Sequence, residues 1–234
     1  MRPPILLAAS FLVAGCAMAI PALVTPAGLH PASDAEARAW AKSTVPTAWK
    51  RIHFSWRFHD FNTEQNTGGT GNLVITPPDS LFLSFRPALL ASGGDAGVVG
   101  DSAIWAEPKD KVEQLVPSYH LLWAVVGIAR PPGVGWSVET SQDVKAKSTA
   151  VRYSRGSDTV QYVSVRSGRP NLQTTVVVGG KPLGVVVTLY DQYRNLISSH
   201  LTISGSTAQL AITFDSTVKQ VRVDKDAWTA PHDH

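Results

Sequence analysis

VEQLVPSYHLLWAVVGIARPP, residues 112–132, is the stretch that decides how the rest of this chain folds. Its apolar residues recur at three- and four-residue steps and fill most of the remaining sides, which is typical of a buried helix. Pro117 suits a first helical turn and Pro131-Pro132 stop the helix, so we expect it over Pro117–Arg130. The run is too short to span a bilayer, which takes ~20 apolar residues. By itself the stretch is explained as an ordinary core helix.

Almost everything on either side of this helix has the alternating pattern of β-strands. Along Arg51–Phe61 apolar residues occupy every second position, which is typical of a half-buried strand. Three more strands are expected before the helix, around Leu73–Ile75, Leu81–Phe85 and Ala96–Trp105, with Asn66–Gly71 as a glycine-rich turn. Eight are expected after it, near Gly135–Thr140, Ala150–Ser154, Val160–Arg166, Leu172–Val178, Gly184–Tyr190, Leu196–Ile203, Gln209–Phe214 and Gln220–Asp224.

This regular spacing indicates an antiparallel meander or barrel. The expected fold class is therefore mainly β (α+β), one apolar helix lodged in a large curved sheet. At 234 residues one or two domains are possible, and large β folds of this length are often a single domain.

The N-terminus has the pattern of a secretory signal: a short basic start, an apolar run of nine residues from Ile5 to Val13, and small residues after it. Val13-Ala14-Gly15-Cys16 resembles a bacterial lipobox, in which cleavage leaves a diacylated Cys16 as the first mature residue. The alternative is a general secretory signal cut near Ala19. Acyl chains on Cys16 would anchor the chain to a membrane, and Ala17 favours the outer membrane under the sorting rule of enteric bacteria.

These features divide the chain into three parts. Residues 1–15 are the expected signal peptide, and residues 47–234 form the β domain. Between them, residues 16–46 hold a lipid-anchored tether with three prolines, expected to be flexible, and a short helix from Ser33-Asp34 to about Thr44.

Composition and motifs argue against catalysis, metal binding and nucleic-acid binding. The formal charge is only +3 and Lys and Arg are spread singly, so we expect no nucleic-acid partner. A single cysteine excludes an internal disulfide and a multi-cysteine metal site. His53 and His59 share one strand face but lie ~20 Å apart, too far to share a metal ion. No G-x-S-x-G, H-E-x-x-H or Walker sequence occurs, so neither an enzyme nor a cofactor is expected.

Several pieces occur in the order of a known family. They are the lipobox, a short helix, an aromatic strand, a GxG before a strand ending in Pro-Pro-Asp-Ser, a strand reaching Trp105, the helix with LLWAVVGI and a long meander. Together they resemble the periplasmic lipoprotein carriers and receptors of the LolA/LolB-like family, over roughly Trp49–Val223. The resemblance implies an unclosed β-barrel plugged by helices, and the lipobox is more similar to the anchored receptor than to the soluble carrier.

The inward-facing apolar residues are the candidate binding site. They are Phe54, Trp56, Phe58, Leu73, Ile75, Leu83, Phe85, Trp105, Leu122, Trp123 and Val126. Composition alone favours a dry packed core, whereas the resemblance implies a cavity for acyl chains. Leu89 and Leu90 form a separate candidate in the loop Pro87–Gly94, where the family's receptor carries an exposed Leu. This pair would contact membrane or cargo, or else fold back as a lid.

Two functions follow from these alternatives. The first is a membrane-anchored lipoprotein, facing the periplasm at the outer membrane, that binds acyl chains of lipid or lipoprotein cargo. The second is a non-catalytic structural or envelope-assembly lipoprotein with a packed core. Neither assigns a protein partner.

The anchor can be tested directly. We expect Cys16→Ser to release the protein into the soluble periplasm, because the acyl chains contribute most of the membrane affinity at ~0.8 kcal/mol per buried methylene. Fractionation of cells expressing each form measures this, and a variant that stays with the membrane would contradict the lipobox assignment.

Overall fold

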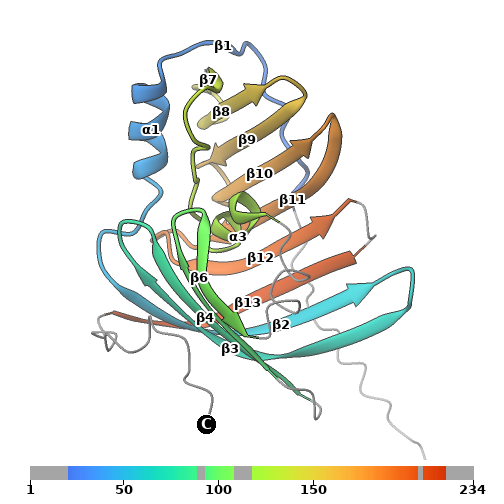
Figure 1. Ribbon diagram of the computed structural model, residues 1–234. Helices are drawn as coiled ribbons and strands as arrows, with labels where there is room; N and C mark the ends of the chain where they lie inside the picture. The colour runs from blue at the N-terminus through green and yellow to red at the C-terminus, as the bar shows by residue number, and fades with distance from the viewer. Residues whose placement is uncertain (1–20, 89–92, 108–117, 205–207, 220–234) are drawn as a thin grey trace, which may run out of the picture.

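The computed structural model describes residues 21–88, 93–107, 118–204 and 208–219, and thirteen strands of this part join in one curved antiparallel sheet (Figure 1). The strands are β1 (His30–Pro31), β2 (Lys50–Asp60), β3 (Gln65–Thr76), β4 (Ser80–Pro87), β5 (Gly94–Val99), β6 (Ser102–Glu107), β7 (Ser137–Asp143), β8 (Ser148–Arg155), β9 (Asp158–Val165), β10 (Asn171–Val178), β11 (Lys181–Tyr190), β12 (Leu196–Ile203) and β13 (Ala208–Lys219). The helices of the described part are α1 (Asp34–Lys42) and α3 (Tyr119–Val125).

The order of strands places the second half of the chain before the first. It runs β1-β7-β8-β9-β10-β11-β12-β13-β2-β3-β4-β5-β6, so β13 pairs with β2 and the sheet ends at β1 and β6 without closing. The chain between β6 and β7 therefore connects strands near opposite ends of the sheet. Helix α3 belongs to this connection and lies on the concave face (Figure 1). The predicted fold class, a mainly β unclosed barrel with an apolar helix inside, is confirmed.

Strand β2 shows why the sheet has an apolar face. Ile52, Phe54 and Trp56 are buried, whereas Arg51 and Arg57 alternate with them on the outer face. The predicted period of two is confirmed here, because successive residues of a strand point to opposite faces.

The glycine-rich segment is where the structure first departs from expectation. Asn66–Gly71 is not a turn but part of β3, and the turn to β2 lies earlier, where Glu64 has a φ of 53°. A Cβ on Gly69 would lie 1.9 Å from the carbonyl oxygen of Arg86 on β4. Glycine in this strand thus permits a close approach of neighbouring backbone rather than a reversal of direction.

A second departure concerns Ala96–Trp105, which is two strands rather than one. Strands β5 and β6 are joined at Gly100, whose φ of 60° is readily adopted by glycine. Five strands, β2 to β6, therefore precede α3 in one meander. The expected strand Gln220–Asp224 lies outside the described residues.

Helix α3 is shorter than the predicted Pro117–Arg130. Ser118 caps it by accepting a hydrogen bond from the His120 amide over 3.2 Å. At the other end Gly127, with a φ of 77°, turns the chain away, so the helix stops before the proline pair. The amides of Gly127 and Ile128 donate to the carbonyls of Ala124 and Trp123, the paired bonds of a Schellman motif.

Helix α1 covers another part of the concave face. Ser33 caps it through the Glu36 amide, and Ala37 and Ala41 are each 1% exposed. Trp40 packs on Tyr162 of β9 with ring centroids 6.2 Å apart. The predicted short helix is confirmed, ending at Lys42. Among the described residues no helix is long and apolar enough to cross a membrane.

The end of α3 gives a stability test. A Cβ on Gly127 would lie 2.5 Å from the Tyr190 hydroxyl oxygen, in a backbone conformation that alanine adopts only under strain. We expect Gly127→Ala to cost roughly 1–3 kcal/mol and to lower the melting temperature by ~2–4 °C per kcal/mol. Gly133→Ala is the matched control, because a Cβ there meets nothing within 4 Å. Equal melting temperatures for the two variants would contradict this account of the helix end.

Candidate functional site

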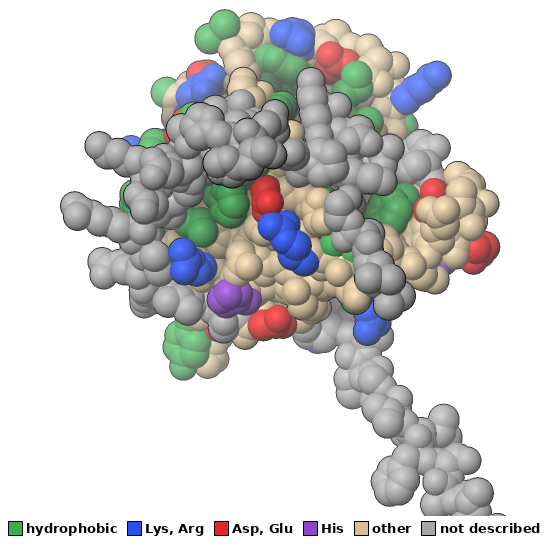
Figure 2. Space-filling model, turned by 60° about the horizontal axis from the view of Figure 1, so that its bottom comes forward, with side chains coloured by type: hydrophobic (Ala, Val, Ile, Leu, Met, Phe, Trp, Pro, Cys, Tyr) green, Lys and Arg blue, Asp and Glu red, His purple; other side chains and the backbone are tan. Residues whose placement is uncertain are grey.

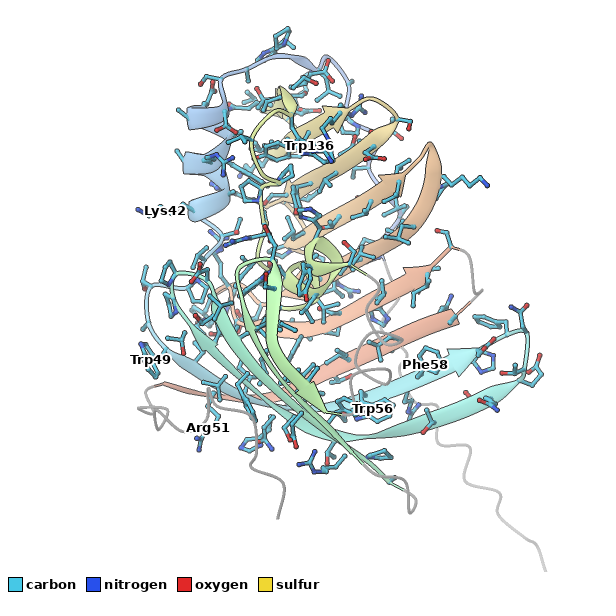
Figure 3. All side chains as sticks on the ribbon, in the orientation of Figure 1. Lys42, Trp49, Arg51, Trp56, Phe58 and Trp136 are labelled. Carbon is cyan, nitrogen blue, oxygen red and sulfur yellow. The ribbon has the colours of Figure 1, made fainter. Side chains whose placement is uncertain are left out.

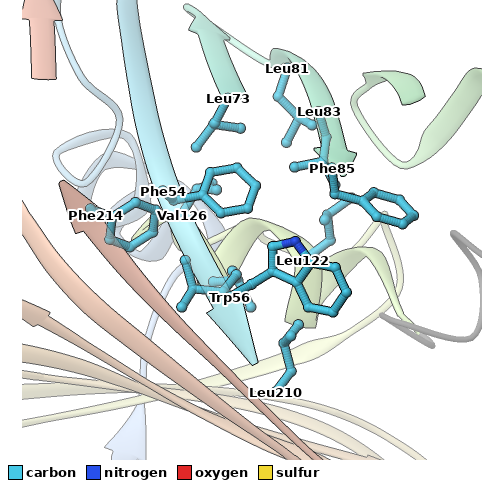
Figure 4. Close-up of a pocket in the computed structure, with 12 residues that line it drawn as sticks. Phe54, Trp56, Leu73, Leu81, Leu83, Phe85, Leu122, Val126, Leu210 and Phe214 are labelled. Atoms are coloured by element: carbon cyan, nitrogen blue, oxygen red, sulfur yellow. The ribbon is translucent and has the colours of Figure 1, made fainter. Parts of the chain in front are cut away.

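An apolar pocket lies between α3 and the wall formed by β13, β2, β3 and β4 (Figure 4). Its volume is about 40 Å³, and it is only partly enclosed. All twelve lining residues are apolar: Phe54, Trp56, Leu73, Leu81, Leu83, Phe85, Leu122, Val125, Val126, Leu210, Ile212 and Phe214. Because the lining is entirely apolar, a water molecule inside the pocket would find no hydrogen-bond partner in its walls.

Glycines shape the aromatic wall of this pocket. The register places Phe54 of β2 opposite Gly71 of β3, Gly71 opposite Phe85 of β4, and Phe85 opposite Gly94 of β5. A Cβ on Gly71 would lie 2.2 Å from the Phe54 ring, and one on Gly94 would lie 2.3 Å from the Phe85 ring. Each ring thus lies over the backbone of a neighbouring glycine, in the place that the Cβ of any other residue would occupy.

The aromatic residues of the wall also contact one another edge to face. Phe54 and Phe214 have ring centroids 6.4 Å apart at an interplanar angle of 67°, and Trp56 and Phe85 have centroids 6.0 Å apart at 89°. Such pairs contribute ~0.5–1.5 kcal/mol beyond the burial of their area. The Trp56 indole also donates to the Thr70 carbonyl over 3.3 Å.

The structure brings seven of the predicted residues together in the lining. They are Phe54, Trp56, Leu73, Leu83, Phe85, Leu122 and Val126. Ile75 is buried elsewhere in the core, and Phe58 lies farther along β2 from Trp56 (Figure 3). Cys16, Leu89, Leu90 and the side chain of Trp105 lie outside the described residues.

Trp123 is placed differently from the prediction. Its side chain is 1% exposed and is absent from the pocket lining. Its indole N–H donates to the carbonyl of Gly100, in the β5–β6 turn, over 2.7 Å. Trp123 therefore joins α3 to the β5–β6 turn. The helix face toward the pocket is formed instead by its neighbours Leu122 and Val126.

Five lining residues were missed from the sequence: Leu81, Val125, Leu210, Ile212 and Phe214. The alternation of Leu210, Ile212 and Phe214 was visible as a strand pattern. Their place in the pocket depends on the pairing of β13 with β2, in which Phe214 lies opposite Phe54. That pairing joins residues about 150–170 positions apart and leaves no local signal.

The end of α3 is fastened to one wall by hydroxyl groups. The Thr188 hydroxyl donates to the Ala124 carbonyl over 2.6 Å, and the Ser199 hydroxyl donates to the Val125 carbonyl. The Tyr190 hydroxyl donates to the Gly127 carbonyl over 2.9 Å, and burial raises the pKa of this phenol. These bonds satisfy helix-end carbonyls that water cannot reach.

The segment after α3 is held by a second group of polar contacts. The Tyr162 hydroxyl donates to the Arg130 carbonyl over 2.6 Å, and His120 Nδ1 lies 3.0 Å from the same oxygen. The Arg130 side chain pairs with Asp101 at 3.1 Å and reaches Asp79 at 4.0 Å. These carboxylates lie in the β5–β6 and β3–β4 turns, so Arg130 joins the helix side of the pocket to the opposite wall.

The two sets of contacts differ in strength. The hydroxyls of Thr188 and Ser199 are buried, and a buried carbonyl left unpaired costs ~1–3 kcal/mol. The Arg130 pairs are partly exposed, with Asp101 49% exposed, and such pairs contribute ~0–1 kcal/mol each. Helix α3 is therefore bound to β11 and β12 by buried hydroxyls and to the β5–β6 turn by the buried Trp123 indole, whereas the Arg130 pairs add little.

Metal-ligating side chains do not gather into a metal-binding site in the described part of the chain. No three His, Cys, Asp or Glu side chains there lie close enough to hold a metal ion. On the face shown in Figure 2, basic and acidic side chains are interspersed with apolar ones. What the pocket can do chemically is to remove apolar surface from water.

The half-buried His120 predicts a pH dependence of stability. Burial lowers its pKa below the ordinary value of 6.5, so the unfolded chain takes up a proton before the folded one does. Stability is therefore full above pH ~6.5 and falls as the pH drops further. We expect His120→Gln, which keeps a donor for Arg130, to reduce the loss of unfolding free energy between pH 7 and pH 5. Burial also lowers the pKa of His200. His200→Gln, measured in the same way, gives the contribution of this second histidine to the loss of unfolding free energy. Denaturant titrations at both pH values measure this, and an unchanged loss in His120→Gln would refute it.

Comparison with known proteins finds similarity in solved structures. No family model and no curated protein matches the chain. A LolA superfamily protein from Nitrosomonas europaea is 8% identical, with a TM-score of 0.38 over 85% of this chain and 99% of that one. A DUF1329 family protein from Desulfovibrio piger is 7% identical, with a TM-score of 0.33 over 82% and 94%. A domain described as that of an outer membrane lipoprotein-sorting protein from Vibrio parahaemolyticus is 10% identical, with a TM-score of 0.27 over 83% and 95%.

Scores of this size carry no argument about activity or ligand. The architecture is established by the strand order and by the helix on the concave face, and it is the one that the sequence resemblance to the LolA/LolB-like family implies.

Proposed function

We propose that this chain binds an acyl chain of a lipid or lipoprotein in the pocket between α3 and β2–β4. The observation that supports the proposal is a partly enclosed pocket lined by twelve apolar side chains. An acyl chain matches that lining, because each methylene removed from water contributes ~0.8 kcal/mol and needs no polar partner. The Trp56 indole N–H is already satisfied by the Thr70 carbonyl, so it makes no demand on a ligand.

The pocket must enlarge before it can accept such a ligand. Its volume of about 40 Å³ has room for roughly three waters, at ~10–15 Å³ for each. Since α3 is bound to β11 and β12 by buried hydroxyls and to the β5–β6 turn by the buried Trp123 indole, we propose that the wall of β2–β4 moves away from the helix. Parting the partly exposed contact of Arg130 with Asp79, in the β3–β4 turn, costs less than uncovering the carbonyls of α3.

Membrane attachment completes the proposal. A lipid on Cys16 would hold the protein at the outer membrane, facing the periplasm. Leu89 and Leu90 would lie in the loop after β4, where they contact membrane or cargo or form a lid. Two of the similar structures carry the names LolA superfamily and outer membrane lipoprotein-sorting, which agree with the proposal without supporting it.

A structural or envelope-assembly lipoprotein is the alternative function. The small volume of the pocket favours it, because the same side chains would then be a packed core with a minor defect. Native mass spectrometry of the purified protein separates the two functions. Co-purified acyl lipid supports the carrier function, and a protein that stays empty after incubation with lipid supports the structural one.

Binding inside the pocket can be tested with a fluorescent fatty acid. Leu83 is half-buried and lines the pocket, so Leu83→Asp places a charge at the ligand while disturbing the core little. We expect the affinity of the probe to fall at least tenfold, ~1.4 kcal/mol, and the quenching of tryptophan emission to disappear. Thr202→Asp, at an exposed position on β12, is the control and should bind normally. Equal affinity in a folded Leu83→Asp protein would place the probe elsewhere and refute the proposed site.

A further inference from the structure

The segment before α1 is bound to the sheet rather than hanging free. We call residues 21–31 the strap. The Val24 amide donates to Gln173 Oε1 over 2.7 Å, and Gln173 Nε2 donates to the Ala22 carbonyl over 3.2 Å. Farther along, the Ser141 hydroxyl donates to the Ala27 carbonyl, and β1 then pairs with β7. Figure 1 shows this part of the chain running from β1 down behind the strands.

The strap follows a row of residues on the outer face of the sheet. The register aligns Ser141 of β7, Ala150 of β8, Val163 of β9 and Gln173 of β10. These four are only 3–8% exposed, although an outer face is normally solvated and polar. Small and apolar side chains in the middle of the row leave room for a backbone to pass over them.

Length agrees with this path. Three strand spacings separate β7 from β10, which amounts to ~14 Å. The strap covers that distance between its Gln173 contact, centred on Leu23, and its Ser141 contact at Ala27. Four residues of extended chain span ~13–14 Å, so the strap crosses the strands almost fully extended.

Gln173 holds the strap as a neighbouring strand would. Its side-chain amide accepts from the residue after Leu23 and donates to the residue before it, the pair of bonds that a backbone partner makes. Gln173 is only 3% exposed beneath the strap, and each of its two bonds to the strap contributes ~0.5–1.5 kcal/mol relative to bonds with water.

The row also defines the face on which the N-terminus leaves. Along β11, Val187 continues the row, whereas the next residue, Thr188, points to the concave face and bonds to α3. The strap and the pocket therefore lie on opposite faces of the sheet.

We propose that the strap fixes the exit of the N-terminus on the outer face near β10, opposite the pocket, and so sets how far the domain can move from a lipid-anchored Cys16. Six residues separate Cys16 from Ala22, a reach of ~20 Å. With the strap released as far as His30, fourteen residues would separate Cys16 from the sheet, a reach of ~46–50 Å. The membrane part of this inference rests on the proposed anchor, and the docking of the strap does not.

Hydrogen exchange of the Val24 amide tests the docking. We expect protection in the full-length protein and exchange on the order of tenfold faster in Gln173→Leu, which removes both bonds at similar side-chain size. Thr175→Val is the control, since it alters the same face of the same strand and leaves Gln173 in place. Exchange of Val24 at the rate of an unstructured peptide in the unmodified protein would overturn the proposal.

Energy transfer on vesicles tests the reach. In the lipidated protein Cys16 is blocked, so a cysteine introduced by Val144→Cys, at an 86% exposed position after β7, can be labelled alone. We expect transfer to a bilayer dye to decrease when Gln173→Leu and Ser141→Ala are added, because the longer undocked segment lets the domain move away from the bilayer. Equal transfer with and without these changes would refute control of the reach. Failure of the protein to bind vesicles would refute the anchor and the membrane part together, while the Val24 result would still decide the docking.

Discussion

The structure depends on one requirement: the chain must cross the concave face of the sheet to connect β6 with β7, and the backbone that crosses must keep its hydrogen bonds there. An apolar interior offers no water to unpaired carbonyls, so a buried crossing has to be helical where it can and capped where it cannot. Helix α3 meets the first condition over seven residues. Hydroxyls of Thr188, Ser199 and Tyr190 meet the second, reaching from β11 and β12 to the carbonyls at the helix end.

Helix α3 is held to β11 and β12 by buried hydroxyls, whereas toward β2–β4 it presents the apolar side chains of Leu122 and Val126. On that wall the rings of Phe54 and Phe85 lie over the backbone of glycines. The pocket is the result of this difference. The Arg130 pairs lie at its partly exposed border, where they contribute little to stability. The buried indole of Trp123 bonds to the β5–β6 turn, away from the pocket lining.

Both faces of the sheet are used, each for a different purpose. The concave face holds the two helices and the pocket, while the outer face of β7–β10 holds the strap through Gln173 and Ser141. Because side chains alternate along a strand, neighbours in sequence serve the two faces in turn, as Val187 and Thr188 do. The strap on the outer face of β7–β10 and the pocket on the concave face of β13 and β2–β4 thus lie on different faces and on different strands of one sheet.

The sequence by itself determined the local features: the alternation of β2, the helix at residues 34–42, the apolar character of the stretch around α3, and the meander of strands after it. These follow from periodicity and from capping residues, which act over a few positions.

The tertiary structure decided the rest. It showed that Gly68–Gly71 lies in a strand, where the glycines permit the close approach of β4 and of the Phe54 ring. It also placed Phe214 in the pocket and Trp123 outside it, since the first depends on the pairing of β13 with β2 and the second on the turn at Gly100. The strap was expected to be a flexible tether, because its prolines and lack of periodicity resemble a linker. Its partners, Gln173 and Ser141, lie more than a hundred residues away, and only the folded sheet brings them beneath it.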